Sequence, residues 1–239
     1  MGADGLAVIE KSEDADLAMR MFNRDGSEGM MAVNCLRYVG KYAYDRGIVP
    51  KEQMTVQTAK GVRRLSLVPI HGEAGSVSVE VGTADFTAKN VPVKSHSRRV
   101  IDTLTTIGGR DYRITCLSMG NPHCVVFTDS VDSLDLNRIG PQFEYDPMFP
   151  ERVNAEFVHV VDEYLITMRV WERGSGETQA CGSGACAAVA AATELGLCKK
   201  DTPVTVKLTG GDLQVVCASD GRVTITGGAE TVYEGIVKI

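Results

Sequence analysis

Several features that define other protein classes are missing from this sequence of 239 residues. There is no CxxC pair and no HExxH string, so we expect neither a zinc knuckle nor another metal site. No apolar run is long enough to span a bilayer and no signal peptide is visible, so we expect a cytoplasmic protein without a membrane partner. Basic residues are outnumbered, with 25 Lys and Arg against 31 Asp and Glu and a net charge of −6. This balance argues against a nucleic-acid partner.

The cysteines do not form a recognisable disulfide framework, because their number is odd. The seven are Cys35, Cys116, Cys124, Cys181, Cys186, Cys198 and Cys217. Free cysteine behaves as a small hydrophobic residue, so we expect most of these thiols in the core.

Hydrophobic residues make up 44% of the chain, which is typical of a globular protein of one or two domains. Nine short segments rich in Val, Ile and aromatic residues predict strands. They are Arg64–Pro69, Ser76–Val81, Tyr112–Leu117, Cys124–Thr128, Ala155–Val161, Leu165–Trp171, Val204–Leu208, Leu213–Cys217 and Val223–Thr226. Two segments are predicted to be helices, Asn34–Arg46 and the Ala-rich Gly182–Leu195. Each is followed directly by a glycine, Gly47 or Gly196, which is typical of a helix end. This pattern predicts an α+β fold in which sheet covers each helix.

An internal repeat is the most informative feature of the sequence. Met, Arg, an aromatic residue, a second Arg and a Glu recur at the same offsets before two equivalent positions. The copies are Met19–Arg24 with Glu28 and Ala32, and Met168–Arg173 with Glu177 and Cys181. In both copies a strand-like segment leads through a polar turn into a helix. Each match is a common residue type, but five matches in one register favour duplication over chance.

The second copy carries the chemistry, because Cys181 stands where a Gly-rich turn becomes a helix. The amides of Gly182, Ser183 and Gly184 should be unpaired there and suit a carboxylate. The same helix end should lower the pKa of the thiol and favour a thiolate. A thiolate beside a carboxylate cradle is what deprotonation of an amino-acid Cα requires.

Two residues next to this turn complete the expected half-site. Arg173 can bind a second carboxylate, and Glu172 can hold an ammonium group. The alternative is a structural Gly turn that caps a helix, with Cys181 as filler and Arg173 on the surface.

Two further segments are candidates for ligand contact. Gly120–His123 follows a predicted strand, and its Asn-Pro turn can present polar groups. Phe149–Asn154 opens another strand. Ordinary turn chemistry explains each segment equally well on its own.

These strings together resemble diaminopimelate epimerase, and the resemblance covers essentially the whole chain. The string Glu172–Ala188 is the most specific part. The matching segments are Phe22–Glu28, Met119–Val125, Phe149–Phe157, Glu172–Ala188 and Gly227–Gly235. Proline racemases and phenazine-type isomerases share the architecture but carry a different string around the thiol.

The resemblance implies two pseudo-symmetric domains, each a mostly antiparallel sheet wrapped around a central helix, with the active site in the cleft between them. It implies a cofactor-independent isomerase that interconverts LL- and meso-diaminopimelate for lysine and peptidoglycan precursor synthesis. Two thiols face each other across the substrate Cα, and neither pyridoxal phosphate nor metal takes part. The expected partner is a small amino acid with two carboxylates, and a homodimer is expected.

Individual roles also follow from the resemblance. Cys181 matches the second thiol, Ala32 stands at the position of the first thiol, and His123 and Glu172 match residues beside the thiols. The substrate-binding matches are Asn23, Val33, Asn34, Asn121, Asn154, Glu172, Arg173, Gly182 and Ser183. We expect an N-terminal half of residues 1–95, completed by 229–239, and a C-terminal half of residues 96–228. Val91–Ser97 is expected to be the loop between them.

The sequence departs from the family pattern in two places. The first thiol of the family belongs to a Met-Cys-Gly-Asn string, which here reads Met-Ala-Val-Asn at Met31–Asn34. Cys35 lies three residues beyond Ala32, nearly one helical turn away, and should not reach the same point. The sequence also begins inside the family pattern, at Gly2–Leu6, so we expect an exposed edge on the first sheet and a partly covered first helix.

Three functions stay open at this point. An epimerase requires two acid–base groups, and Ala32 cannot be one of them. The second possibility is a non-catalytic amino-acid-binding homologue. The third is a different isomerase or lyase that uses Cys181 as its one thiol, with water or His123 as the partner. A Cys–His hydrolase is disfavoured because no nucleophile-elbow string is present.

Overall fold

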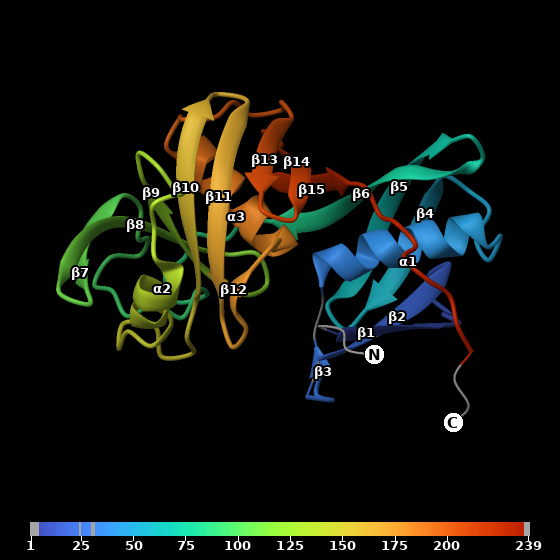
Figure 1. Ribbon diagram of the computed structural model, residues 1–239, viewed down its shortest axis with the longest axis horizontal. Coiled ribbons are helices and arrows are strands. Elements are labelled where there is room, and N and C mark those ends of the chain that lie inside the picture. Colours follow the sequence, from blue (N-terminus) through green and yellow to red (C-terminus); the bar gives the residue numbers. More distant parts are fainter. Residues whose placement is uncertain (1–4, 24, 30–31, 237–239) are drawn as a thin grey trace. The chain divides into compact units, whose positions relative to one another are not determined.

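The computed structural model describes residues 5–23, 25–29 and 32–236, which form two compact units (Figure 1). Unit 1 comprises the residues up to Val79 and those from Thr226 on, and unit 2 comprises Glu80–Ile225. The division into residues 1–95 and 96–228 stays a prediction. Val91–Ser97 is irregular chain within unit 2. Of the residues in the strings above, Gly2–Asp4, Arg24 and Met31 lie outside the described residues.

Unit 1 is a sheet in the order β1-β2-β4-β5-β6, with β3 paired to β2. The strands β2 and β4 run parallel, whereas β1 with β2, β2 with β3, β4 with β5 and β5 with β6 are antiparallel. Its strands are β1 (Gly5–Glu10), β2 (Leu17–Asn23), β3 (Glu28–Gly29), β4 (Gln53–Thr58), β5 (Gly61–Ile70) and β6 (Glu73–Thr83). The helix α1 (Val33–Asp45) packs on β1, β2 and β5. Seven of its thirteen residues are buried, while Tyr38 and Tyr42 stay half exposed.

Unit 2 is a larger sheet in the order β15-β14-β13-β11-β10-β9-β8-β7, with β12 paired to β11. Parallel pairs join β9 to β10 and β11 to β13. Its strands are β7 (Thr103–Ile107), β8 (Arg110–Ser118), β9 (Pro122–Phe127), β10 (Asn154–Asp162), β11 (Leu165–Glu172), β12 (Gly176–Thr178), β13 (Val204–Leu208), β14 (Gly211–Cys217) and β15 (Arg222–Gly227). The α+β prediction is confirmed, and all nine strands predicted from the sequence are present.

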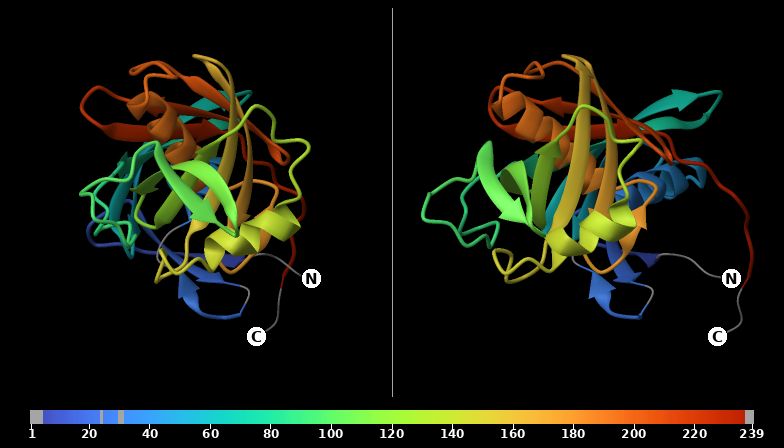
Figure 2. Two further views of the ribbon diagram at one scale, coloured as in Figure 1. Left: turned by 90° about the vertical axis from the view of Figure 1, so that its left-hand side faces the viewer. Right: turned by 60° about the vertical axis from the view of Figure 1, so that its left-hand side comes forward.

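Two helices lie on opposite faces of β10 and β11 (Figures 1 and 2). The strands of unit 2 enclose α3 (Gly182–Glu194), and eleven of its thirteen residues are buried. Its Ala-rich sequence favours helix and lets the strands approach closely. On the other face, α2 (Leu136–Glu144) covers an apolar cluster in which Phe143 makes edge contacts with Tyr112 and Phe157. No helix among the described residues is long and apolar enough to cross a membrane.

The two units repeat one topology, as the sequence repeat predicts. The order β1-β2-β4-β5-β6 with α1 between β3 and β4 corresponds to β10-β11-β13-β14-β15 with α3 between β12 and β13. Equivalent residues around the first two strands differ by 149 in number, which is 168 minus 19. Even a detail repeats, since Arg20 pairs with Glu28 and Arg169 pairs with Glu177, each at 2.8 Å.

Candidate active site

The alternation of side chains along β10 separates the core from the candidate site. Ala155 and Phe157 point into the apolar cluster beneath α2. Asn154 and Glu156, between and beside them, point to the opposite face, where α3 packs. Both polar side chains are buried, with 4% and 0% of their surface exposed. A strand that is buried on both faces thus carries polar groups toward α3.

The neighbouring strands place two more polar residues on the same face. On β9, Cys124 and Val126 belong to the cluster beneath α2, so His123 points toward α3. On β11, Trp171 packs against that cluster, so the next residue, Glu172, points the other way. Three adjacent strands therefore direct their polar side chains at the N-terminal end of α3.

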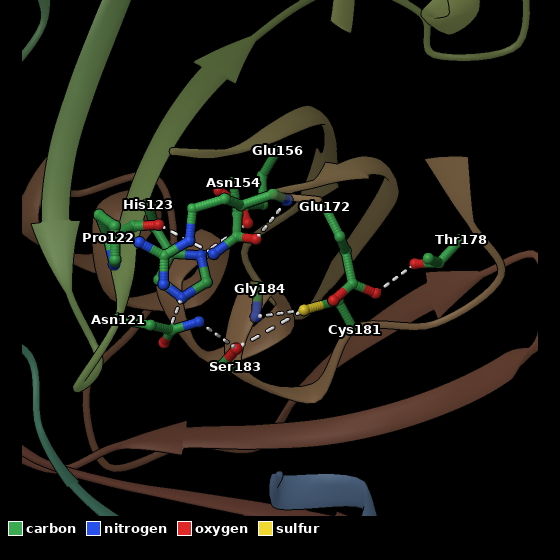
Figure 3. A network of polar contacts seen from close by, with 11 residues as sticks. Asn121, Pro122, His123, Asn154, Glu156, Glu172, Thr178, Cys181, Ser183 and Gly184 are labelled. Atoms are coloured by element: carbon green, nitrogen blue, oxygen red, sulfur yellow. Dashed lines mark hydrogen bonds and ion pairs between the residues drawn. The ribbon is translucent and has the colours of Figure 1, made fainter. Parts of the chain in front are cut away.

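Cys181 is the N-cap residue of α3 and is 6% exposed. Its sulfur accepts the N–H of Gly184 at 3.4 Å and lies 3.5 Å from Ser183 Oγ. Figure 3 shows the sulfur directed at these two groups, with the Glu172 side chain on its other side. Among the described residues, no acceptor is recorded for the amides of Gly182 and Ser183, as expected for a first helical turn. Two of the three amides predicted to be unpaired are therefore open to a ligand, whereas the prediction is wrong for Gly184, whose N–H donates to the Cys181 sulfur.

A chain of polar contacts leads from this thiol to a buried histidine (Figure 3). Asn121 Nδ2 donates to Ser183 Oγ at 3.3 Å, and Asn121 Oδ1 lies 2.9 Å from His123 Nε2. The other ring nitrogen, Nδ1, lies 2.7 Å from Glu156 Oε1. The thiol, the amide, the imidazole and the carboxylate thus form one continuous network.

The remaining predicted residues of unit 2 frame the network. Asn154 Nδ2 donates to the Pro122 carbonyl at 2.9 Å, and its Oδ1 accepts the Arg173 N–H at 2.9 Å. The Arg173 side chain is exposed and donates to the Glu151 carbonyl. Glu172 Oε1 accepts from the Thr178 hydroxyl. These contacts fix the turn that leads into Cys181 and leave the guanidinium of Arg173 at the surface.

The prediction of a lowered thiol pKa is wrong. Burial raises the pKa of the Cys181 thiol well above its ordinary value, and the negative charges of Glu172 and Glu156 raise it further. The contacts from Ser183 and the Gly184 N–H act in the opposite direction but are weaker. Desolvation and two carboxylates therefore outweigh the helix end.

Four predicted residues belong to unit 1. Ala32 is the N-cap of α1 and makes no side-chain cap contact, and Val33 is buried behind it. Asn34 Oδ1 accepts from Arg37 at 3.0 Å. Asn23 is exposed and donates to Ser27 Oγ at 3.0 Å. These residues surround the helix start of unit 1 as the other eight surround that of unit 2.

The sequence analysis missed Glu156 and Thr178. The signal for Glu156 was a single charged residue within the otherwise apolar start of a strand, between Ala155 and Phe157. Thr178 is separated from Glu172 by six residues, and β12 folds back on β11 to bring them together. Among the described residues, no group of three His, Cys, Asp or Glu is placed to hold a metal ion.

This arrangement can perform proton transfer at a carbon next to a carboxylate. A thiol stands beside unpaired amides, which stabilise negative charge that develops on a bound carboxylate. The carboxylates of Glu172 and Glu156 lie near the thiol, so their charges affect how readily it gives up its proton.

Comparison with known proteins agrees with this chemistry. The family model of diaminopimelate epimerase matches residues 1–87 and 115–232. The chain is 45% identical over 240 residues to the diaminopimelate epimerase of Acetivibrio thermocellus, covering 100% of this chain and 85% of the relative. It is 45% identical over 237 residues to that of Geobacillus kaustophilus, covering 99% and 82%, and 42% identical over 240 residues to that of Methanococcus maripaludis, covering 100% and 86%.

Solved structures share the fold at lower identity. A phenazine biosynthesis protein of Bacillus anthracis matches with a TM-score of 0.69 at 16% identity, covering 95% of this chain and 82% of that one. A hydroxyproline epimerase of Agrobacterium vitis matches with a TM-score of 0.67 at 16% identity, covering 94% and 71%. On the strength of its sequence relatives, the chain belongs to the diaminopimelate epimerase family of isomerases.

Proposed function

We propose that this chain acts on diaminopimelate as a cofactor-independent isomerase and that Cys181 is its acid–base thiol. The observation that carries the proposal is the N-cap of α3, where the thiol stands beside the amides of Gly182 and Ser183. A substrate carboxylate held by these amides would place its Cα next to the sulfur. The identity of 42–45% to diaminopimelate epimerases favours this function over a binding homologue or a different isomerase.

The second acid–base group distinguishes this chain from a symmetric two-thiol enzyme. The position equivalent to Cys181 is Ala32, whose methyl group carries no exchangeable proton. We therefore expect fast proton exchange on the face of Cα that Cys181 serves. Inversion requires a proton on the opposite face and should be slower, with water supplying it.

The test incubates the protein with LL- and with meso-diaminopimelate in D2O and follows both deuterium at Cα and stereochemistry by NMR. Deuterium should enter one stereoisomer with retention faster than inversion occurs. Equal inversion from both sides at the rate of exchange would contradict the role given to Ala32. Absence of exchange from either isomer would favour the non-catalytic homologue.

The proposal extends to the cellular setting. We propose a cytoplasmic homodimer that works in lysine and peptidoglycan precursor synthesis, and the family resemblance is the support for each part. Sedimentation equilibrium across a concentration series tests the dimer, because a monomer at every concentration would contradict it.

A further inference from the structure

Glu156 is a buried carboxylate that is only half satisfied. Its side chain is 0% exposed, and Oε1 lies 2.7 Å from His123 Nδ1. Within the described part of the chain, Oε2 is buried without a hydrogen-bond partner. Leaving a buried polar atom without a partner costs stability. A carboxylate buried at this cost suggests a role beyond packing.

Gly184 leaves the space between this carboxylate and the Cys181 thiol free of a side chain. An added Cβ at Gly184 would lie 2.9 Å from Glu156 Oε1 and 3.3 Å from Cys181 Sγ. The carboxylate and the sulfur therefore both border the space that a side chain at position 184 would fill, and Gly184 places no side chain between them. The charge of Glu156 acts on the sulfur over this short distance, and it raises the pKa of the thiol.

Unit 1 shows that the frame does not require this carboxylate. The offset of 149 makes Ala7 of β1 the counterpart of Glu156, and the strand registers agree, since Ala7 pairs with Met21 and Glu156 pairs with Val170. The same offset makes Cys35 the counterpart of Gly184. Unit 1 builds the same strands and helix with a methyl group at this point, so the fold alone does not explain Glu156.

The imidazole of His123 faces an oxygen on each side. Nε2 faces Asn121 Oδ1 at 2.9 Å, and Nδ1 faces Glu156 Oε1 at 2.7 Å. A proton must lie between Nδ1 and Oε1, on one atom or the other, for both contacts to be hydrogen bonds. Burial raises the pKa of Glu156 to about 7, against the opposing effect of His123, so the carboxyl group changes its protonation state near neutral pH.

We propose that Glu156 is a positioning residue of the candidate site: it orients His123 through Nδ1 and, across the space that Gly184 leaves free, controls the reactivity of the Cys181 sulfur. The inference rests on the proposed function in taking Cys181 as the reacting thiol. Its test needs no substrate, so it can fail or succeed independently of isomerase activity.

The other titratable groups around Glu156 are few. His123 faces it from β9, Glu172 acts from β11, and Cys181 lies at the start of α3, while the Cys124 side chain points into the cluster on the other face of the sheet. Burial raises the pKa of Cys124 well above its ordinary value, so this thiol stays protonated near neutral pH. Among these neighbours, the charge that changes near pH 7 is therefore that of Glu156, which acts on both His123 and Cys181.

The experiment compares the wild type, Glu156→Gln and a matched control, Glu144→Gln. Glu144 is also a buried carboxylate of unit 2, and it accepts from Trp171 Nε1 at 2.8 Å and from the Gly174 N–H at 2.9 Å. Two readouts are taken from pH 5.5 to 9, a range that extends up to about two pH units on either side of the Glu156 transition. The first is the rate of Cys181 alkylation by iodoacetamide, located by mass spectrometry, and the second is the set of 15N signals of His123.

In the wild type the His123 signals should show a transition near pH 7 that Glu156→Gln removes and Glu144→Gln retains. Alkylation of Cys181 at pH 8 should be at least about threefold faster in Glu156→Gln than in the wild type, because a negative charge near the sulfur is gone. Equal alkylation rates in the two proteins, or a His123 transition that survives Glu156→Gln, would overturn the proposal.

If Glu156→Gln does not fold, the wild type alone decides the question. The His123 transition and a change in slope of the Cys181 alkylation profile should then occur at one pH. Transitions at separate pH values would show that the pair and the thiol are not coupled and would overturn the inference.

Discussion

The two units start their central helices with nearly the same backbone and with different chemistry. Ala32 has φ −123° and ψ 119°, and Cys181 has φ −115° and ψ 111°. The cap of α3 is a thiol that accepts the Gly184 N–H, whereas the cap of α1 is a methyl group without a side-chain contact. The strand, turn and helix of a half-site therefore form whether or not they carry an acid–base group.

The differences extend to the residues that face the cap. Glu156, Glu172 and Gly184 of unit 2 correspond to Ala7, Asn23 and Cys35 of unit 1. A large side chain on the strand is matched with a glycine on the helix in unit 2, and a small one with a cysteine in unit 1. In each unit a larger residue on one element is matched with a smaller residue on the other, so the two pairs fill a similar volume. Among these positions, carboxylates occur only in unit 2. The same backbone therefore accepts different charges without a change in the volume that is packed.

Removal of the thiol of unit 2 should have the largest effect on activity. We expect Cys181→Ala to lower the rate of Cα deuterium exchange by about a thousandfold, because acid–base groups contribute factors of that order. The rate is measured by NMR in D2O. The matched control is Cys35→Ala, which should exchange like the wild type; a comparable loss in the control would mean that Cys35 replaces the missing first thiol.

The buried carboxyl group of Glu156 should also make stability depend on pH. The pKa of Glu156 is about 7 in the folded protein and near its ordinary 4.5 when unfolded, so the folded state holds the extra proton between these values. The contribution of Glu156 to the free energy of unfolding should be fully present below pH 4.5 and fall by about 2–3 kcal/mol as the pH rises through 7. Urea unfolding at pH 5 and pH 8 measures this change. Glu156→Gln should reduce the dependence, and an unchanged slope would contradict the assignment.

Restoring the missing group should make the units more alike. The double variant Ala32→Cys with Val33→Gly gives unit 1 the thiol and glycine that Cys181 and Gly182 provide in unit 2. We expect inversion of diaminopimelate to become at least about tenfold faster, since a second acid–base group is available. The control is Ala32→Ser with Val33→Gly, which has a similar size but no thiol. Equal rates in the two double variants would argue that position 32 does not take part.

The smallest expected difference concerns the repeated arginine pair. Arg169 also donates to the carbonyls of Val131 and Leu134, whereas Arg20 is about half exposed beside Glu28. We expect Arg169→Met to lower the free energy of unfolding by about 1–2 kcal/mol, because two partly buried carbonyls lose their donor. Arg20→Met should leave the thermal midpoint unchanged within error. Equal losses of unfolding free energy in the two variants would show that both arginine pairs stabilise the protein to the same extent.

Much of this fold could be predicted because local signals agreed with it. Both central helices were predicted to within one residue at each end, and Gly47 and Gly196 adopt the left-handed φ of 67° and 73° that ends a helix. The helix α2 was missed because Gly140 and Pro141 lie inside it and conceal its periodicity. The strands β4 and β7 were missed because polar residues alternate along their exposed faces.

The candidate site was predictable where it lies in one string and unpredictable where the fold assembles it. Cys181, Gly182 and Ser183 are consecutive, so the thiol and its amide cradle could be inferred together. The direction of the thiol pKa could not, because it depends on burial and on Glu156, which lies on another strand. A local motif does not show how deeply the rest of the chain will bury the thiol, and burial sets the direction of its pKa.

The two central helices have thirteen residues each, and each ends at a glycine two positions after its last residue. Helix length therefore fixes both the position and the direction of the cap, since each residue turns the cap by about 100° and advances it by about 1.5 Å. A duplicated chain can lose a thiol and keep its geometry, but losing one residue from either helix would turn its cap away from the direction it now faces. Deletions inside these helices should thus be far rarer among relatives than substitutions at their caps.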